Sequence, residues 1–108
     1  MSHLIVGDVS LDLVAALQPL VSRIKRHDRS LAQQLVRAAS SITLNIAESD
    51  YSDPGTKRSR LFSAAGSANE TRAAVRLAVR WRYCAAEEVA AAEQLLDRVI
   101  AMLWKLTH

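Results

Sequence analysis

Cysteine, glycine and proline are scarce in this chain of 108 residues, and it has no long apolar run. Because Cys84 is the lone cysteine, an intrachain disulfide and a metal site of several cysteines are excluded. Three glycines and two prolines are too few for the many turns of an all-β protein. No segment approaches the roughly 20 consecutive apolar residues of a membrane span, and the start of the chain lacks the parts of a signal peptide. We therefore expect a soluble, cytoplasmic protein with no membrane partner.

The chain also lacks the groups of residues that build an enzyme site. His3, His27 and His108 are scattered, and none lies four residues from another histidine or from the cysteine, so no metal site is predicted. No histidine is placed to activate Cys84, and no set of nucleophile, base and oxyanion donors is visible. The sequence favours a protein with no enzymatic activity, no cofactor and no small-molecule substrate.

What is present is typical of one all-α domain. Hydrophobic residues make up 50% of the chain and charged residues 23%, and the helix formers alanine, leucine and arginine are common. A length of 108 residues suffices for one domain and leaves little room for a second. The net charge of +3 and the isoelectric point near 9.5 permit a phosphate-bearing partner without requiring one.

Apolar residues recur at intervals of three and four along four segments, which short polar loops separate. Ser10 is expected to cap the first helix after a loose lead-in, and Pro19 to kink that helix or divide it. Ser30 and Asp53 are the expected caps of the second and third helices. The pattern predicts one antiparallel up-down-up-down four-helix bundle over residues 1–108. Its helices are assigned to residues 10–25, 31–48, 54–82 and 86–106.

Each helix has an apolar stripe that is expected to face the core. In the first helix the stripe is Val14, Leu17, Val21 and Ile24. In the fourth it is Val89, Ala92, Leu96, Val99, Leu103 and Leu106. The third helix is apolar on several sides: its first stripe is Leu61, Ala64, Ala68, Val75 and Val79, and its second is Phe62, Gly66, Ala73 and Leu77. One bundle cannot cover all of these sides, so we infer an interface between subunits. Trp81 and Trp104 are interpreted as packing residues.

The second helix resembles a known family. The stretch HDRSLAQQLVRAASSITLNIAES is similar to the four-helix bundle proteins first noticed as open reading frames in intervening sequences of bacterial 23S ribosomal RNA genes. The matching residues are Arg37, Ala38, Ala39, Ser41, Ile42, Asn45, Ile46, Ala47 and Glu48, followed by Gly66, Ser67 and Glu70 in the third helix and the aromatic turn Trp81 to Cys84. The resemblance extends over about residues 20–106. Thr43, Ser49 and Arg82 depart from it, since the family has proline in many members at the first of these positions and glycine at the other two.

The resemblance implies a homopentameric ring of bundles without an established activity. A distant relative is the accessory protein of diversity-generating retroelements, a basic pentamer that works with a reverse transcriptase and nucleic acid. Fold analogy of this kind does not confer function.

Two sets of polar residues are candidates for function. The first set is Arg37, Asn45, Glu48, Ser67 and Glu70, which is either a catalytic pocket or, as we favour, a buried polar network that fixes helix register. The second set is the arginine stripe Arg58, Arg72, Arg76 and Arg80, which lies within about 80° on the third helix. Its charges call for acids or phosphates opposite. The acids of a neighbouring subunit (Glu87, Glu88, Glu93, Asp97) are the favoured partners, and nucleic acid, RNA or DNA, is the alternative.

The sequence therefore predicts a homo-oligomeric helical scaffold or adaptor. It would engage nucleic acid, or an enzyme that acts on nucleic acid, through arginine-rich surfaces. The alternative is a structural module that binds only proteins.

Overall fold

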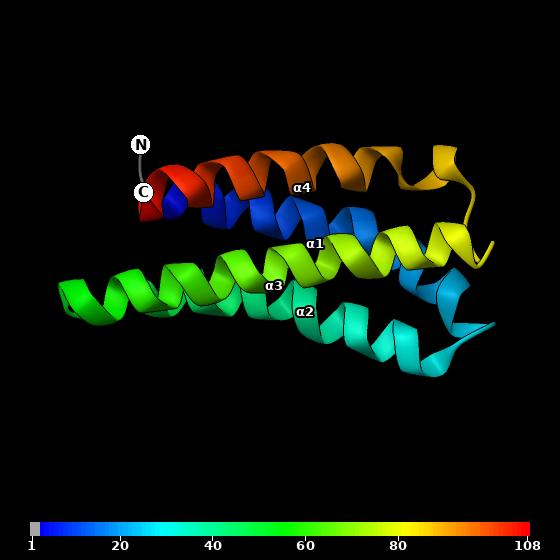
Figure 1. The fold of residues 1–108 in the computed structure, drawn as a ribbon, viewed down its shortest axis with the longest axis horizontal. Coiled ribbons are helices and arrows are strands. Elements are labelled where there is room, and N and C mark those ends of the chain that lie inside the picture. The colour runs from blue at the N-terminus through cyan, green and yellow to red at the C-terminus, as the bar shows by residue number, and fades with distance from the viewer. Residues whose placement is uncertain (1–2) are drawn as a thin grey trace.

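The computed structural model describes residues 3–108, and these residues form four helices and no strand. Figure 1 shows that the chain reverses direction at each loop, so consecutive helices run antiparallel. α1 and α3 each pack against both α2 and α4, in a body that measures 42 × 22 × 20 Å. The all-α prediction is confirmed. The helices are α1 (His3–Lys25), α2 (Arg29–Ser49), α3 (Pro54–Arg80) and α4 (Ala86–Thr107).

The helix α1 begins earlier than the sequence predicted. It starts at His3, and Ser10 is a buried residue inside it, not its cap. The Ser10 hydroxyl donates to the Gly7 carbonyl at 2.7 Å and shares a 2.8 Å hydrogen bond with the hydroxyl of Thr43 in α2. The earlier start extends the buried stripe by two residues, Val6 and Val9. The expected lead-in at residues 1–2 lies outside the described residues.

The helix α1 also continues unbroken through Pro19, so its division into two pieces was wrong. The stretch Ile5–Lys25, with a mean hydropathy of 1.4, is long and apolar enough to cross a membrane. A third of that window is buried inside the bundle, and one such helix is weak evidence of a membrane span, because core helices of soluble proteins and signal sequences pass the same test of length and hydropathy.

Of the two caps predicted for α2 and α3, one is wrong and one is confirmed. α2 is capped by Asp28 and not by Ser30: the Asp28 carboxylate accepts from the Leu31 backbone N–H at 2.9 Å. α3 begins as predicted, with Asp53 accepting from the Thr56 N–H at 2.9 Å. That backbone hydrogen bond, followed by one from the Thr56 hydroxyl, lowers the pKa of Asp53 below its usual 3.8.

The end of α3 is formed by a residue in the left-handed region. The helix stops at Arg80, and Arg82 has a φ of 66°, the conformation that favours glycine. The Tyr83 N–H donates to the Ala78 carbonyl at 2.9 Å and the Arg82 N–H to the Val79 carbonyl at 3.0 Å, which closes the last turn. The sequence predicted that this helix ends near residue 82, because no glycine marks an earlier end.

One apolar core fills the space between the helices. The predicted stripe of α4 is buried except for its last member, Leu106, which is half-buried. In α1 the prediction was wrong by one residue at two positions: Leu13 and Leu20 are buried, while Val14 is 38% exposed and Val21 half-buried. Leu17 and Ile24 belong both to the predicted stripe and to the buried face, so the spacing of apolar residues alone did not identify the buried face.

Candidate functional site

The polar residues among those that carry the family resemblance in α2 line a shallow groove on the outer side of α2 and α3. The groove has a volume of about 410 Å³. Leu44 stands at its surface with 62% of its area exposed. The residues that line it are Arg37, Ser40, Ser41, Leu44, Asn45 and Glu48 of α2 and Arg60 of α3.

A short chain of hydrogen bonds joins α2 to α3 beside this groove. Ser67 of α3 donates its hydroxyl to the Ser41 hydroxyl at 2.8 Å. The Asn45 amide donates to the Ser41 carbonyl at 2.9 Å and to its hydroxyl at 3.0 Å. All three side chains are half-buried, so two of the five predicted network residues, Asn45 and Ser67, meet through a serine that was not among them.

The charged members of that predicted network are at the surface and not buried within the subunit. Glu48 forms an ion pair with Arg60 of α3 at 3.0 Å, and about half of each side chain is exposed. Arg37 and Glu70 are exposed, and neither has an ion-pair partner within residues 3–108. For Arg37 and Glu48 the reason is the orientation of α2: Leu35, Ile42 and their neighbours face the core, which turns these two charged residues outward.

The outer face of α3 is apolar, and no helix covers it within residues 3–108. Phe62 is 43% exposed and Leu77 is 47% exposed. Gly66 and Ala73 lie exposed between them. A Cβ atom built at Gly66 would have nothing within 4 Å, so the packing of this chain does not require glycine there.

The arginine stripe of α3 faces α4 of the same chain. Arg72 lies 3.8 Å from Asp97, and Arg76 lies 3.8 Å from Glu93. From the sequence, acids of a neighbouring subunit were expected opposite this stripe. In the structure two of those acids, Glu93 and Asp97, come from the same chain as the arginines. Of the other two expected acids, Glu88 pairs with Arg23 of α1 at 3.0 Å.

The two ends of the arginine stripe differ. Arg58 donates to the Thr107 carbonyl at 3.2 Å and lies over the Phe62 ring, 5.4 Å from its centroid. Arg80 is exposed and has no ion pair within the described part of the chain. Arg80 is therefore the member of the stripe with a charge free for another molecule.

Cys84 and the two tryptophans differ in exposure. Cys84 is buried, and that burial, with the nearby carboxylate of Glu88 as a smaller cause, raises the pKa of its thiol. Trp81 is 65% exposed and Trp104 is 59% exposed, so their interpretation as packing residues was wrong. Within residues 3–108 no three His, Cys, Asp or Glu side chains are grouped as metal ligands would be.

Comparison with known proteins finds a similar solved structure and a matching family model. A crystal structure of a protein with unknown function from the S23 ribosomal protein family of Bacteroides thetaiotaomicron has a TM-score of 0.87 at 22% identity, covering 94% of this chain and 97% of that chain. At this identity the likeness shows the fold alone. The curated proteins contain no match. The family model of the 23S rRNA-intervening sequence protein matches residues 2–105. Because this match spans nearly the whole chain, the protein belongs to the 23S rRNA-intervening sequence protein family.

Proposed function

We propose that the protein is a non-enzymatic scaffold that assembles with copies of itself through the outer surface of α2 and α3. The observation that carries this proposal is the apolar strip of α3, where Phe62 and Leu77 remain exposed after the bundle has formed. Leu44 adds a third exposed apolar side chain on the neighbouring helix. Burying such side chains stabilises an assembly by about 1.5–3 kcal/mol for each one fully buried.

Gly66 supports a close approach of a second copy. A glycine inside a helix costs roughly 0.5–1 kcal/mol relative to alanine. Nothing in the chain occupies the space where its Cβ would be, so contacts within the subunit do not account for the glycine. A second helix packed at this point would use that space.

Charge complementarity supports the same surface. Arg37 and Glu70 lie on adjoining helices, are exposed, and have no ion-pair partner within the described chain. Opposite charges on one surface are suited to a contact between identical copies, where each copy offers both signs. The family resemblance adds the expectation of a pentameric ring.

Light scattering tests this proposal by measuring the molar mass of the purified protein, which is compared with the subunit mass of 11.9 kDa. The unmodified chain is expected to be a multiple of this mass, and Leu77→Asp and Gly66→Trp are expected to reduce it to one subunit. Ala15→Asp, on an exposed position of α1, is the matched control and should leave the assembly intact. A wild-type protein that stays at the mass of one subunit at micromolar concentration would overturn the proposal.

The adaptor role toward nucleic acid through the arginine stripe stays a prediction. Arg58, Arg72 and Arg76 have partners within the chain, which favours a structural role for that part of the stripe. The alternative function is a structural module that binds only proteins. A titration with structured RNA and duplex DNA over a salt series separates the two, because binding to phosphates weakens steeply with salt.

A further inference from the structure

One end of the bundle gathers cations and aromatic rings in a way that neither the core nor the proposed assembly uses. This loop end is formed by the loop between α1 and α2, at residues 26–28, and the loop between α3 and α4, at residues 81–85. The two loops lie at the same end of the molecule in Figure 1. The cations and rings of the loop end are Lys25, Arg26, His27, Arg29, Arg80, Trp81, Arg82 and Tyr83.

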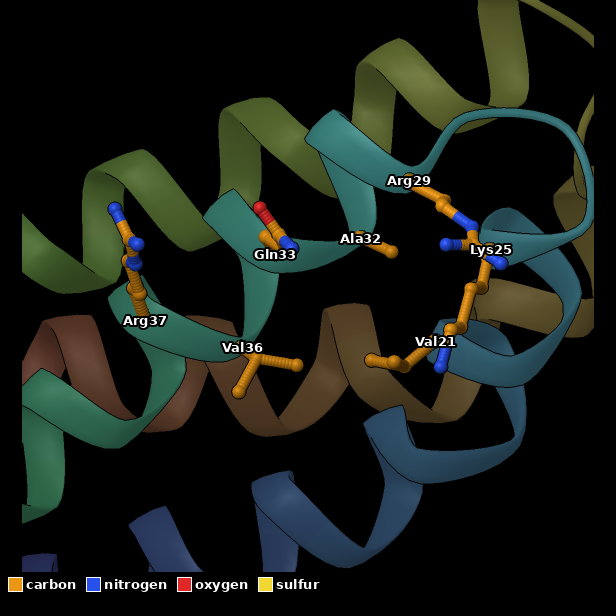
Figure 2. A pocket seen from close by; sticks show the side chains of 7 residues that line it. All are labelled: Val21, Lys25, Arg29, Ala32, Gln33, Val36 and Arg37. Carbon is orange, nitrogen blue, oxygen red and sulfur yellow. The ribbon is translucent and has the colours of Figure 1, made fainter.

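An open cavity of about 400 Å³ lies between α1 and α2 beside this end. Figure 2 shows Lys25 and Arg29 toward one end of the lining and Arg37 at the other end, further along α2. Its remaining lining is Val21, Ala32, Gln33 and Val36. The lining thus contains three cations and no acid, and none of the three has an ion pair in the described part of the chain. Like charges gathered without an acid repel one another, and an anion placed among them relieves that repulsion.

A column of three rings lies at the same loop end. The Tyr83 ring is parallel to that of His27, with centroids 5.1 Å apart and 6° between the planes. The Trp81 ring stacks against the Tyr83 ring as well, with centroids 6.5 Å apart and 16° between the planes. The Tyr83 hydroxyl donates to the Asp28 carboxylate at 3.4 Å, which holds the central ring in place. With 65% of its area exposed, Trp81 offers a flat apolar surface to a further ring.

Two of the acids near the loop end are already engaged, whereas Glu87, in the first turn of α4, is exposed and has no ion pair within residues 3–108. Asp28 caps α2 and accepts from Tyr83. Glu88 accepts from the Ala85 N–H at 2.7 Å and pairs with Arg23. By contrast, three exposed arginines of this end have no ion pair within residues 3–108: Arg26, Arg80 and Arg82. The positive charge of the loop end is therefore directed at solvent.

We propose that the loop end binds single-stranded nucleic acid, with an unpaired base stacked on Trp81 and the neighbouring phosphates held by Lys25, Arg29 and the exposed arginines. A groove of cations with an aromatic platform is the arrangement that binds single strands, because every base has a flat face and every nucleotide a phosphate. In a duplex the bases are paired and their faces are covered, so the platform selects unpaired segments. Apart from Arg37, which also lines the groove on α2 and α3, the residues of this site lie outside the α2–α3 surface, and the site does not require assembly.

The two exposed tryptophans allow a matched test of the platform. Fluorescence anisotropy measures binding of a labelled oligouridylate of about 12 nucleotides, within the range of strand lengths that such sites cover. Trp81→Ala is expected to weaken binding about 10-fold or more, because stacking on one aromatic ring contributes about that much. Trp104→Ala removes the other exposed tryptophan and should leave binding unchanged. Trp81→Phe keeps a ring and should bind more tightly than Trp81→Ala.

The cations are tested by a pair of double variants with equal change of charge. Lys25→Gln with Arg29→Gln removes two cations of the loop end, and Lys57→Gln with Lys105→Gln removes two at the other end of the bundle. Each lost phosphate contact lowers the salt dependence of binding to a single strand by about 0.7 in the log–log slope, so the first pair should lower it by about 1.4. The second pair should leave the slope unchanged.

Three results would overturn the proposal: equal losses from the two tryptophan variants, equal affinity for a duplex of the same length, or equal competition by polyglutamate of matched charge. The last would show that the loop end recognises acidic polymers of any kind. Light scattering and circular dichroism of each variant, matched to those of wild type, ensure that lost binding reflects the site and not lost assembly or folding.

Discussion

Ser67 of α3 donates a 2.8 Å hydrogen bond to Ser41 of α2, and the same antiparallel register brings Arg60 within 3.0 Å of Glu48. The two contacts lie seven residues apart on each helix, in opposite directions along the chain. The polar residues of the family pattern thus mark how α2 and α3 are aligned.

Loss of the serine pair should cost a modest amount of stability. Ser67→Ala is expected to lower the free energy of unfolding by about 1 kcal/mol, the usual net value of one intramolecular hydrogen bond. Urea unfolding of Ser41→Ala, Ser67→Ala and the double variant measures the coupling between them. Ser63→Ala, an exposed serine of α3, is the control and should change stability by less than about 0.5 kcal/mol. Strict additivity of the two single changes would contradict a direct bond.

Replacing Arg82 with glycine should stabilise the protein. Its φ of 66° is unfavourable for a side chain by about 1–2 kcal/mol, and glycine removes that cost. Arg82→Gly is expected to raise the urea midpoint, whereas Arg82→Ala, which keeps a Cβ, is not. If alanine stabilises as much as glycine, the gain comes from the lost charge and not from the backbone.

The buried face of α1 is tested by two neighbouring residues. Leu13 is fully buried, so Leu13→Ala should cost about 2–5 kcal/mol, the range measured for such cavities. Val14 is 38% exposed, and Val14→Ala should cost under about 1 kcal/mol. Thermal unfolding of both variants measures the two losses of stability. A larger loss from Val14→Ala than from Leu13→Ala would contradict the buried face of the structure and support the stripe predicted from the sequence.

These residues also show what the sequence could and could not predict. The α4 stripe was identified because one face of that helix is apolar and the opposite face polar. In α1 Leu13 and Val14 are both apolar, so periodicity did not distinguish the faces. Ser30 was predicted as the cap because Gln33, three residues later, completes a capping-box pattern, whereas in the structure Asp28 accepts the hydrogen bond.

The candidate surfaces were predicted less completely. The arginine stripe was found from sequence, but its in-chain partners depend on the register of α3 against α4: moving from Arg72 to Arg76 on one helix moves from Asp97 to Glu93 on the other. The ring column of His27, Tyr83 and Trp81 joins two loops far apart in the chain, and no local pattern marks it.

The cap of α3 should make stability depend on pH in acid. The pKa of Asp53 is lowered in the folded protein, so its carboxylate contributes stability above its usual value of 3.8. That contribution is lost as the pH falls through the lower, folded-state pKa. Wild type should therefore lose part of its advantage over Asp53→Ala between pH 5 and more acidic solutions, measured by thermal unfolding at each pH. A difference between the two proteins that is constant with pH would contradict this role.

The ion pairs between α3 and α4 should contribute little to stability, and their removal separates two roles of the arginine stripe. Exposed pairs contribute about 0–1 kcal/mol, and both pairs have a separation of 3.8 Å. Arg72→Gln with Arg76→Gln is therefore expected to lower the free energy of unfolding by no more than about 1–2 kcal/mol, with the loss reduced in high salt. If the stripe is structural, nucleic-acid affinity should be unchanged in this double variant but weakened in Arg80→Gln, which lies at the loop end. If nucleic-acid affinity is weakened equally in the double variant and in Arg80→Gln, the whole stripe acts as a binding surface.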